Sequence, residues 1–397
     1  MTGALDGLKI LDLSRVLAGP TCTQLLGDMG AEVWKVENPA TGGDDTRHWG
    51  PVSVRDADGR ETDLSGYFLS ANRNKFSVAL DLASPEGQAA VRRLAAEADV
   101  VVENFRPGSL AKFGLDSETL CAAEPRLIYC SISGFGQTGP NREKPGYDLM
   151  AQAYGGIMSL TGDPKGEPMK VGVAVADVIC GLYAATGILA ALRHRDLTGQ
   201  GQSIDLALLD TQMAWLINVG TTYLETGEEP HRHGNAHPAI VPYQVFQASD
   251  GHVAVAVGND RQFTRFCDFL GLPGLADDPR YATNPARTQN RDSLMHEILP
   301  AIGAMSVAQV VDGLTERAVT VSPVQTVGQA LTSDQAAARE MVVKVARSGT
   351  AAGAVRLLGN PLKFSRTPVR YDRPPPFCGE HTDEILGRYA TPDQTSE

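Results

Sequence analysis

Short apolar segments alternate with helix-like segments in the first half of the chain, and this alternation constrains the fold most strongly. The strand-like segments are 9–13, 32–37, 76–82, 100–102 and 126–133. One helix between them begins at Ser84-Pro85, where a capping serine precedes a proline suited to the first helical turn. Strands that are apolar throughout are typical of a parallel sheet with helices on both faces. The alternation therefore predicts a doubly wound α/β fold.

The length of the chain predicts more than one domain. Its 397 residues exceed what a single hydrophobic core usually holds. A polar segment rich in proline and glycine begins after Glu225 and is typical of a linker. We expect the first part of a large domain over 1–224, a linker and small α+β domain over 225–330, and a segment over 331–397 that completes the large domain.

Charge and composition argue against several classes of protein. The net charge of −12 argues against nucleic acid and anionic membranes as partners. The uncharged stretches fall short of the roughly 20 apolar residues of a membrane span, and the N-terminal residues show no signal-peptide pattern. The six cysteines form no C-x-x-C pair and lie mostly in apolar surroundings, as reduced thiols do. We therefore expect a cytoplasmic protein that binds any anionic ligand through a local basic cluster.

Loops that follow the predicted strands are the expected ligand site, because ligands of open α/β sheets bind beyond the carboxyl ends of the strands. Three of these loops stand out, namely 15–20, 103–108 and the glycine-rich 134–140. Arg106 and Lys112 accompany an aromatic residue and an asparagine, a combination that suits the phosphates of a nucleotide. Singly, each basic residue could be a solvated surface charge, but their confinement to one sheet edge favours a ligand.

Two cofactor sites are weakly supported by the sequence. A nicotinamide-dinucleotide site with Glu37 as the ribose ligand needs G-x-G-x-x-G in the first turn, where this chain has only Ala18-Gly19-Pro20. His231, His233 and His237 could suggest a metal, but no cysteine or acidic residue accompanies them at ligand spacing. We expect neither a nicotinamide cofactor nor a metal.

The segment 171–181 carries a single carboxylate, Asp177, among small apolar residues. An uncharged run over 182–192 follows and ends in the basic residues 193–195, which predicts a buried helix whose first residue is Asp177. An aspartate at the start of a helix is commonly an ordinary N-cap. It could also be a nucleophile held in a dry pocket. The local sequence leaves both interpretations open.

These motifs together resemble the class III (CaiB/BaiF-type) CoA-transferases along nearly the whole chain. The matching segments, in the same order, are 11–20, 45–47, 102–108, 172–177, 198–202, 374–376 and 379–382. The resemblance implies a Rossmann-like large domain, linkers to a small domain, and two ring-shaped subunits interlocked as a homodimer. It also implies that Asp177 is the nucleophile and that coenzyme A enters as acyl-CoA substrate, with no permanently bound cofactor.

The implied reaction passes CoA through two covalent intermediates on Asp177. The carboxylate attacks an acyl-CoA thioester and forms an anhydride, which the CoA thiolate converts into an aspartyl–CoA thioester; a small carboxylic acid then reverses these steps. Because anhydrides hydrolyse, the site must exclude water, and the apolar flanks of Asp177 fit this requirement.

The resemblance also implies which residues bind CoA. The expected contacts are Val16, Leu17, Asn38, Leu80, Ala83, Asn104, Phe105, Arg106, Lys112, Lys144, Tyr147 and Asp148. A glycine-rich loop that some members place over the active site would fall at 257–260, where this chain has one glycine.

Three segments indicate the substrates. The segments 49–51, 139–148 and 237–246 look most like those of the succinate–hydroxymethylglutarate (glutarate) CoA-transferases within the family. This likeness predicts dicarboxylic acids, such as succinate in succinyl-CoA, as donor and acceptor. A second carboxylate on the substrate needs a cation, and Arg15 and Arg47 are the predicted partners.

Two other activities stay open from the sequence. Relatives that racemise α-methylacyl-CoA use a His-Asp pair where this chain has Tyr147-Asp148, and a tyrosine is a poor base near neutral pH. A non-catalytic CoA-binding protein is the second alternative, in which Asp177 would be replaceable.

Overall fold

The chain forms two compact units in the computed structural model, which describes residues 3–50 and 53–389. The larger unit consists of Met1–Ile157, Lys170–Gly227 and Gln335–Glu397, and the smaller one of Met158–Met169 and Glu228–Asp334. The segment 158–169 belongs to the smaller unit, although the sequence analysis assigned it to the large domain.

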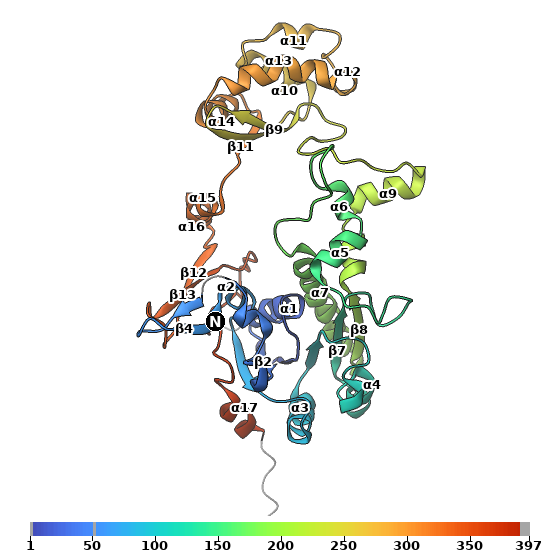
Figure 1. The fold of residues 1–397 in the computed structure, drawn as a ribbon, viewed down its shortest axis with the longest axis vertical. Helices are drawn as coiled ribbons and strands as arrows, with labels where there is room; N and C mark the ends of the chain where they lie inside the picture. The colour runs from blue at the N-terminus through green and yellow to red at the C-terminus, as the bar shows by residue number, and fades with distance from the viewer. Residues whose placement is uncertain (1–2, 51–52, 390–397) are drawn as a thin grey trace, which may run out of the picture. The chain divides into compact units, whose positions relative to one another are not determined.

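A six-stranded parallel sheet forms the centre of the larger unit (Figure 1). In spatial order its strands are β5 (Lys75–Ala79), β2 (Glu32–Glu37), β1 (Lys9–Asp12), β6 (Val100–Glu103), β7 (Ile128–Ser133) and β8 (Gln202–Ala207). Every neighbouring pair of strands is parallel. The predicted α/β class with a parallel sheet is therefore confirmed.

The strand order locates the expected ligand site. Counted along the chain, the six strands of this sheet follow the spatial order 3-2-1-4-5-6. In sheets of this order, ligands bind in the crevice where the direction of winding reverses. The reversal lies between β1 and β6, so the loops that follow these two strands should form the site.

Helices cover both faces of this sheet. On one face lie α1 (Ala18–Asp28) and α7 (Val175–Thr198), and on the other lie α3 (Pro85–Glu97), α4 (Ser117–Ala123) and α17 (Thr382–Arg388). Ile10 of β1 packs into the first core and its neighbour Leu11 into the second, because successive strand residues point to opposite faces. The first three residues of β6 are all apolar because both faces of this central strand are buried.

The long helix α7 begins at Val175, two residues before the start predicted from the sequence, and ends at Thr198, which Gly199 follows in the left-handed conformation. The helix is long and apolar enough to span a membrane, but half of its most apolar stretch is buried within the protein. Its small residues Cys180, Ala184 and Ala191 lie in the core shared with α1. This burial is what the core helix of a globular domain shows.

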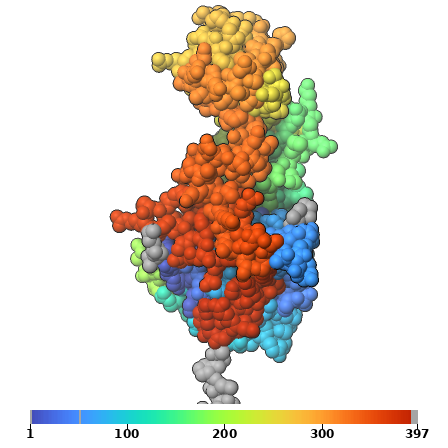
Figure 2. Space-filling view, turned by 90° about the vertical axis from the view of Figure 1, so that its left-hand side faces the viewer, coloured from blue at the N-terminus to red at the C-terminus, as the bar shows by residue number. Residues whose placement is uncertain are grey.

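The end of the chain returns to the larger unit. The backbone N–H of Ala79 donates to Thr382 Oγ1 at 2.9 Å, and that of Gly379 donates to Ser77 Oγ at 2.8 Å. Figure 2 shows this C-terminal segment, in red, on the surface of the unit beside the blue N-terminal residues. Two hairpins accompany it, β3 (Ser53–Arg55) with β4 (Glu61–Ser65) and β12 (Val342–Ala346) with β13 (Ala354–Leu358).

The smaller unit is an α+β unit around a three-stranded antiparallel sheet. Its strands, in spatial order, are β11 (Thr320–Pro323), β10 (Gly251–Ala256) and β9 (Tyr243–Ala248). Its helices include α10 (Asp260–Phe269), α11 (Gly274–Asp277), α12 (Asn284–Gln289), α13 (Arg291–Gly303) and α14 (Val307–Glu316). Phe246, Phe263 and Ile298 are fully buried in its core.

The remaining helices are short. They are η1 (Pro39–Thr41), η2 (Asp45–His48), α2 (Gly66–Ala71), η3 (Ala111–Phe113), α5 (Asp148–Tyr154), α6 (Ile157–Leu160), α8 (Leu208–Ala214), α9 (Ile217–Thr226), α15 (Val327–Thr332) and α16 (Asp334–Ala338).

Candidate active site

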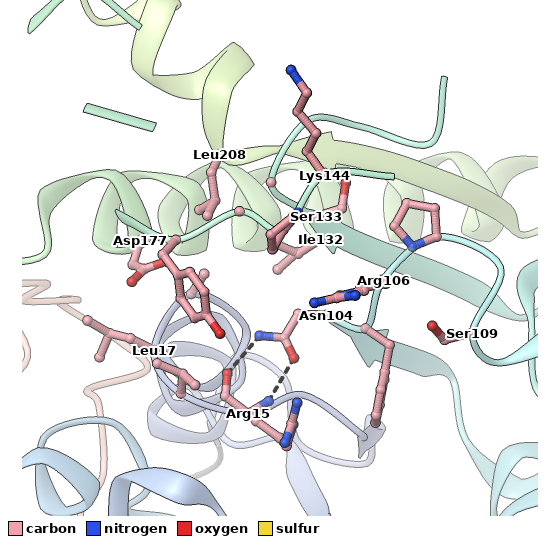
Figure 3. A pocket seen from close by; sticks show the side chains of 18 residues that line it. Arg15, Leu17, Asn104, Arg106, Ser109, Ile132, Ser133, Lys144, Asp177 and Leu208 are labelled. Carbon is pink, nitrogen blue, oxygen red and sulfur yellow. Dashed lines mark hydrogen bonds between the residues drawn. The ribbon is translucent and has the colours of Figure 1, made fainter. Parts of the chain in front are cut away.

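A pocket of about 330 Å³ opens at the carboxyl ends of β1 and β6, at the reversal of the strand order (Figure 3). Its lining includes Arg15, Val16, Leu17, Asn104, Phe105, Arg106, Lys144, Tyr147 and Asp177, nine of the residues that the sequence analysis selected. Figure 3 shows Asp177 and Leu17 on one side of the pocket and Arg106 and Ser109 on the other. The pocket therefore has a carboxylate at one end and a cation at the other.

Asn104 fixes the first loop of the pocket. Its Oδ1 accepts a hydrogen bond from the N–H of Arg15 at 2.8 Å, and its Nδ2 donates to the carbonyl of Arg15 at 2.7 Å. The next residue, Val16, has a φ of +68°, which is strained for a β-branched residue. The N–H of Val16 donates to both carboxylate oxygens of Asp44, each at 3.2 Å. Strain held in place in this way is typical of functional loops.

A buried ion pair fixes Asp44, which accepts the hydrogen bonds from the N–H of Val16 in this loop. Lys35 Nζ lies 2.9 Å from Asp44 Oδ2, and both side chains are fully buried. Burial would raise the pKa of Asp44, but Lys35 and two hydrogen bonds from Thr46 outweigh it and lower the pKa to about 2. Asp44 is therefore ionised at physiological pH and remains an acceptor for Val16.

Asp177 is the third residue of α7 and faces the apolar end of the pocket, where Leu17, Ile132 and Leu208 also line it (Figure 3). Burial and, to a smaller extent, the negative charge of Asp148 raise the pKa of Asp177 to about 7. No hydrogen bond to the carboxylate of Asp177 is found within residues 3–50 and 53–389. The side chain is thus a basic carboxylate that does not act as the N-cap of its own helix.

A second hollow of about 200 Å³ adjoins the first, since Arg15 and Phe105 line both. It contains Asn38, Leu80 and Ala83, three further residues selected from the sequence. Further apolar side chains of its lining are Leu13, Val36, Leu82 and Phe113. The hollow is suited to a flat apolar group next to a phosphate-binding region.

Comparison with known proteins identifies the family. The model of CoA-transferase family III matches residues 5–382. The chain belongs to this family. It is 47% identical over 393 residues to the succinate–glutarate CoA-transferase of Agrobacterium fabrum, covering 99% of this chain and 97% of that protein. It is 41% identical over 388 residues to the succinyl-CoA:mesaconate CoA-transferase of Haloarcula hispanica, covering 97% of this chain and 96% of that protein.

A solved structure agrees with this assignment. The crystal structure of a CaiB/BaiF family protein from Brucella suis superposes with a TM-score of 0.89 at 44% identity, covering 98% of this chain and all of that one. Because full-length relatives at this level of identity are CoA-transferases, this protein is an enzyme of the same kind.

Arg47 does not reach the pocket of this CoA-transferase, and its predicted contact with a substrate carboxylate is wrong. The guanidinium is 1% exposed and binds Glu37 Oε1 at 2.6 Å and Asp63 Oδ2 at 2.9 Å. It also stacks on the ring of Phe68, 3.6 Å from the centroid. Its donors already have partners inside the protein, so it holds the fold together.

Asp148 also differs from its predicted role as a CoA contact. Its Oδ1 accepts a hydrogen bond from the N–H of Ala176 at 2.8 Å, and its Oδ2 accepts one from Gln152 Nε2 at 2.7 Å. Both oxygens therefore serve the protein itself. Lys112 lines neither hollow; its Nζ lies over the ring of Phe113, 4.6 Å from the centroid. Arg15 lies in the pocket and forms a partly exposed ion pair with Asp45 at 3.0 Å.

The sequence analysis did not select Tyr67, whose phenol interacts electrostatically with Asp177. Burial raises the pKa of Tyr67, and the negative charges of Asp177 and Asp148 add to this shift. Trp49 packs edge-on against its ring, with 5.3 Å between centroids. Tyr67 lies in the short helix α2, whose sequence contains no motif, so no signal could have identified it.

The structure offers no preformed metal site in the described part of the chain. No group of three or more His, Cys, Asp or Glu side chains in residues 3–50 and 53–389 could hold an ion. The cysteines are all free thiols.

Proposed function

We propose that this CoA-transferase moves CoA between a dicarboxylyl-CoA, such as succinyl-CoA, and a free dicarboxylic acid, with Asp177 as the covalent carrier. The observation that carries the proposal is the position of Asp177, a basic carboxylate at the apolar end of a pocket whose other end is cationic. An acyl-CoA has the matching polarity, with a thioester at one end and phosphates at the other.

The reaction proceeds in four displacement steps. A carboxylate oxygen of Asp177 attacks the thioester carbonyl, the C–S bond breaks, and CoA leaves as a thiolate. The thiolate attacks the aspartyl carbonyl of the resulting anhydride and releases the donor acid as its carboxylate. The acceptor carboxylate attacks the aspartyl–CoA thioester and expels the thiolate, which then attacks the acceptor's acyl group and frees Asp177. No net proton is taken up or lost.

The properties of Asp177 suit these steps. A carboxylate with a pKa near 7 is more basic than an ordinary aspartate, and is therefore a stronger nucleophile in its ionised form. The apolar lining by Leu17, Ile132 and Leu208 limits the access of water to the anhydride. The N–H groups of the first turn of α1, which has no side-chain cap and begins at Ala18 in the pocket lining, are the proposed donors to the oxyanion.

The cations of the pocket account for the recognition of CoA. The protein carries a net charge of −12, so the phosphates must be bound by local groups. Arg106, Lys144 and Arg15 line the pocket, and within the described residues neither Arg106 nor Lys144 forms an ion pair. The adjoining apolar hollow beside Phe105 fits the adenine ring. This arrangement supports an orientation of acyl-CoA in which the thioester lies towards Asp177.

The choice of dicarboxylic acids is supported by the relatives, whose names specify succinate, glutarate and mesaconate. Arg15 is the proposed partner of the second carboxylate. Its ion pair with Asp45 is half exposed to solvent, and such pairs contribute only about 0–1 kcal/mol. A substrate carboxylate could therefore displace Asp45 at little cost.

An interlocked homodimer in the cytoplasm is part of the proposal. Large apolar side chains are exposed along α5, α7 and α9 of the larger unit, including Tyr154, Leu182, Tyr183, Leu197, Ile217 and Leu224. Exposed apolar surface of this extent commonly marks a subunit interface. The free thiols suit a reducing compartment.

Trapping the covalent intermediate tests the mechanism. Incubation with succinyl-CoA and hydroxylamine should inactivate the enzyme and convert Asp177 into a hydroxamate, which peptide mass spectrometry locates. Asp177→Ala should lose transfer and trapping. Asp196→Ala, an exposed carboxylate near the end of the same helix, is the matched control and should retain both. Transfer by Asp177→Ala at the wild-type rate would refute Asp177 as the covalent carrier, whereas a wild type that transfers no CoA would be a protein that only binds it.

A further inference from the structure

The helix that carries the nucleophile has no N-cap of its own. The residue before α7 is Ala174, which makes no side-chain hydrogen bond to the helix. The first N–H groups of a helix have no partners within it, and they normally bind a side chain or water. Here the N–H of Ala176 donates to Oδ1 of Asp148 at 2.8 Å. The cap of α7 is therefore supplied by α5, from a residue 28 positions earlier.

Asp148 is itself held in place by Gln152, one turn further along α5. Gln152 is fully buried; its Nε2 donates to Asp148 Oδ2 at 2.7 Å, and its Oε1 accepts from the N–H of Val171 at 2.8 Å. These bonds tie α5 both to the first turn of α7 and to the segment that precedes that helix. A glutamine whose two polar atoms are both used in this way fixes the orientation of the carboxylate.

The backbone before Asp148 is also constrained. Gly146 packs against Gly134 of the glycine-rich loop, and a Cβ at Gly146 would lie 2.1 Å from the Cα of Gly134. Only glycine permits this approach. The segment that leads into α5 thus packs against the loop that follows β7.

We propose that Asp148, oriented by Gln152, is a positioning residue for acyl transfer: it fixes the first turn of α7 and places its negative charge beside Asp177. This role rests on the proposed function, in which Asp177 is the nucleophile. A neutral serine, threonine or asparagine would cap the helix equally well. An anionic cap differs because it opposes the charge of the carboxylate that follows Ala176.

This repulsion favours the acylated enzyme. When Asp177 forms an anhydride or a thioester, it loses its charge and the repulsion from Asp148 disappears. An interaction that is unfavourable in the ground state and absent after acylation promotes the forward step. The shift in the pKa of Asp177 agrees with this repulsion, because burial raises that pKa most and the charge of Asp148 raises it further.

Other charged and titratable groups near Asp177 do not produce the repulsion that Asp148 exerts. Tyr67 on α2 and Cys180 on α7 both have raised pKa values, owing chiefly to burial, and are neutral at physiological pH. Arg15, Arg106 and Lys144 line the pocket from other loops. Their positive charges would lower the pKa of Asp177, which is the opposite of the shift found.

The decisive experiment measures the pH dependence of CoA release from succinyl-CoA in a single turnover, without acceptor. Asp148→Asn keeps an acceptor for the N–H of Ala176 but removes the charge and the bond that Gln152 Nε2 donates, so the midpoint of the acidic limb should fall by about 0.5–1 pH unit. Gln152→Leu keeps the charge but releases Asp148, so the maximal rate should fall about tenfold while the midpoint stays.

Asp116→Asn is the matched control. Asp116 caps α4 through the N–H of Thr119, and its amide variant should alter neither the midpoint nor the maximal rate. Circular dichroism and thermal unfolding establish that each variant is folded.

Three results would overturn the proposal. The first is an unchanged midpoint in Asp148→Asn, which would make Asp148 a structural cap. The second is a higher KM for succinyl-CoA with an unchanged midpoint, which would make Asp148 a CoA contact. The third is a wild-type maximal rate in Gln152→Leu, which would overturn the proposal even if Asp148→Asn did not fold. Absence of a covalent intermediate in the wild type would instead refute the proposed function, and this role with it.

Discussion

Replacing Asp177 by asparagine should stabilise the protein against unfolding, even though it abolishes transfer. The pKa of Asp177 is about 7 in the folded protein, against 3.8 in a solvated chain, chiefly because the carboxyl group is buried. The folded state therefore holds the proton more tightly than the unfolded state. As pH rises from about 4 to about 7, the unfolded chain ionises first, and the carboxyl group destabilises the fold by a growing amount.

The structure sets the size of this effect. The two pKa values differ by about three units, and one unit corresponds to about 1.4 kcal/mol, which gives a ceiling of about 4 kcal/mol. Asp177 is partly exposed in the pocket, so water screens its charge and the realised effect should be about 1–2 kcal/mol. The gain should be complete above pH 7 and should shrink as pH falls towards 4.

Urea unfolding of the wild type and Asp177→Asn, at one protein concentration and from about pH 8 to about pH 5, measures the difference. Asp196→Asn, at an exposed site of the same helix, controls for the loss of a carboxylate and should show no such pH-dependent gain. A variant that is less stable than the wild type at pH 8, or a difference that does not vary with pH, would refute the reasoning.

Two further predictions concern residues around the pocket. Arg47→Ala should lower the free energy of unfolding by about 3–5 kcal/mol, because it leaves Glu37 buried without its partner, whereas Arg15→Ala should remain stable and lose the preference for dicarboxylates over monocarboxylates. Urea unfolding measures the stability of both variants, and a panel of acceptor acids measures their preference. A stable Arg47→Ala variant with altered acid preference would contradict the assignment. Asn104→Ala removes both hydrogen bonds to the backbone of Arg15 and should raise KM for succinyl-CoA about tenfold, equivalent to about 1.4 kcal/mol, with the stability little changed; an unchanged KM would show that the strained loop at Val16 does not need this clamp.

The sheet and most of the pocket could be predicted because their signals are local. Val100-Val101-Val102 is apolar on both faces, so it has few alternatives to a central parallel strand. Once the strands are known, the topology brings their loops to one edge. For this reason Arg15, Asn104 and Arg106, which are distant in sequence, lie in one pocket.

The charged residues within strands could not be assigned from the sequence. Lys35 and Glu37 alternate along β2 in a manner that would suit a half-exposed strand, yet both are buried, and Glu37 binds Arg47 instead of a ribose. Whether a buried charged side chain forms an ion pair within the protein depends on a partner residue from another segment of the chain. The position of Arg47 within the motif 45–47 indicates proximity to the site but not the direction of its side chain.

The same limitation explains why the local sequence could not decide the role of Asp177. An aspartate that begins an apolar helix has the sequence signature of an N-cap, and that interpretation would leave its carboxylate engaged by the backbone. In the structure α7 begins two residues earlier, and its cap comes from Asp148. It matters chemically that Asp148 and not Asp177 is the cap, because a capping carboxylate accepts hydrogen bonds that lower its basicity. Since Asp148 caps the helix, the carboxylate of Asp177 stays basic and available for the proposed acyl transfer.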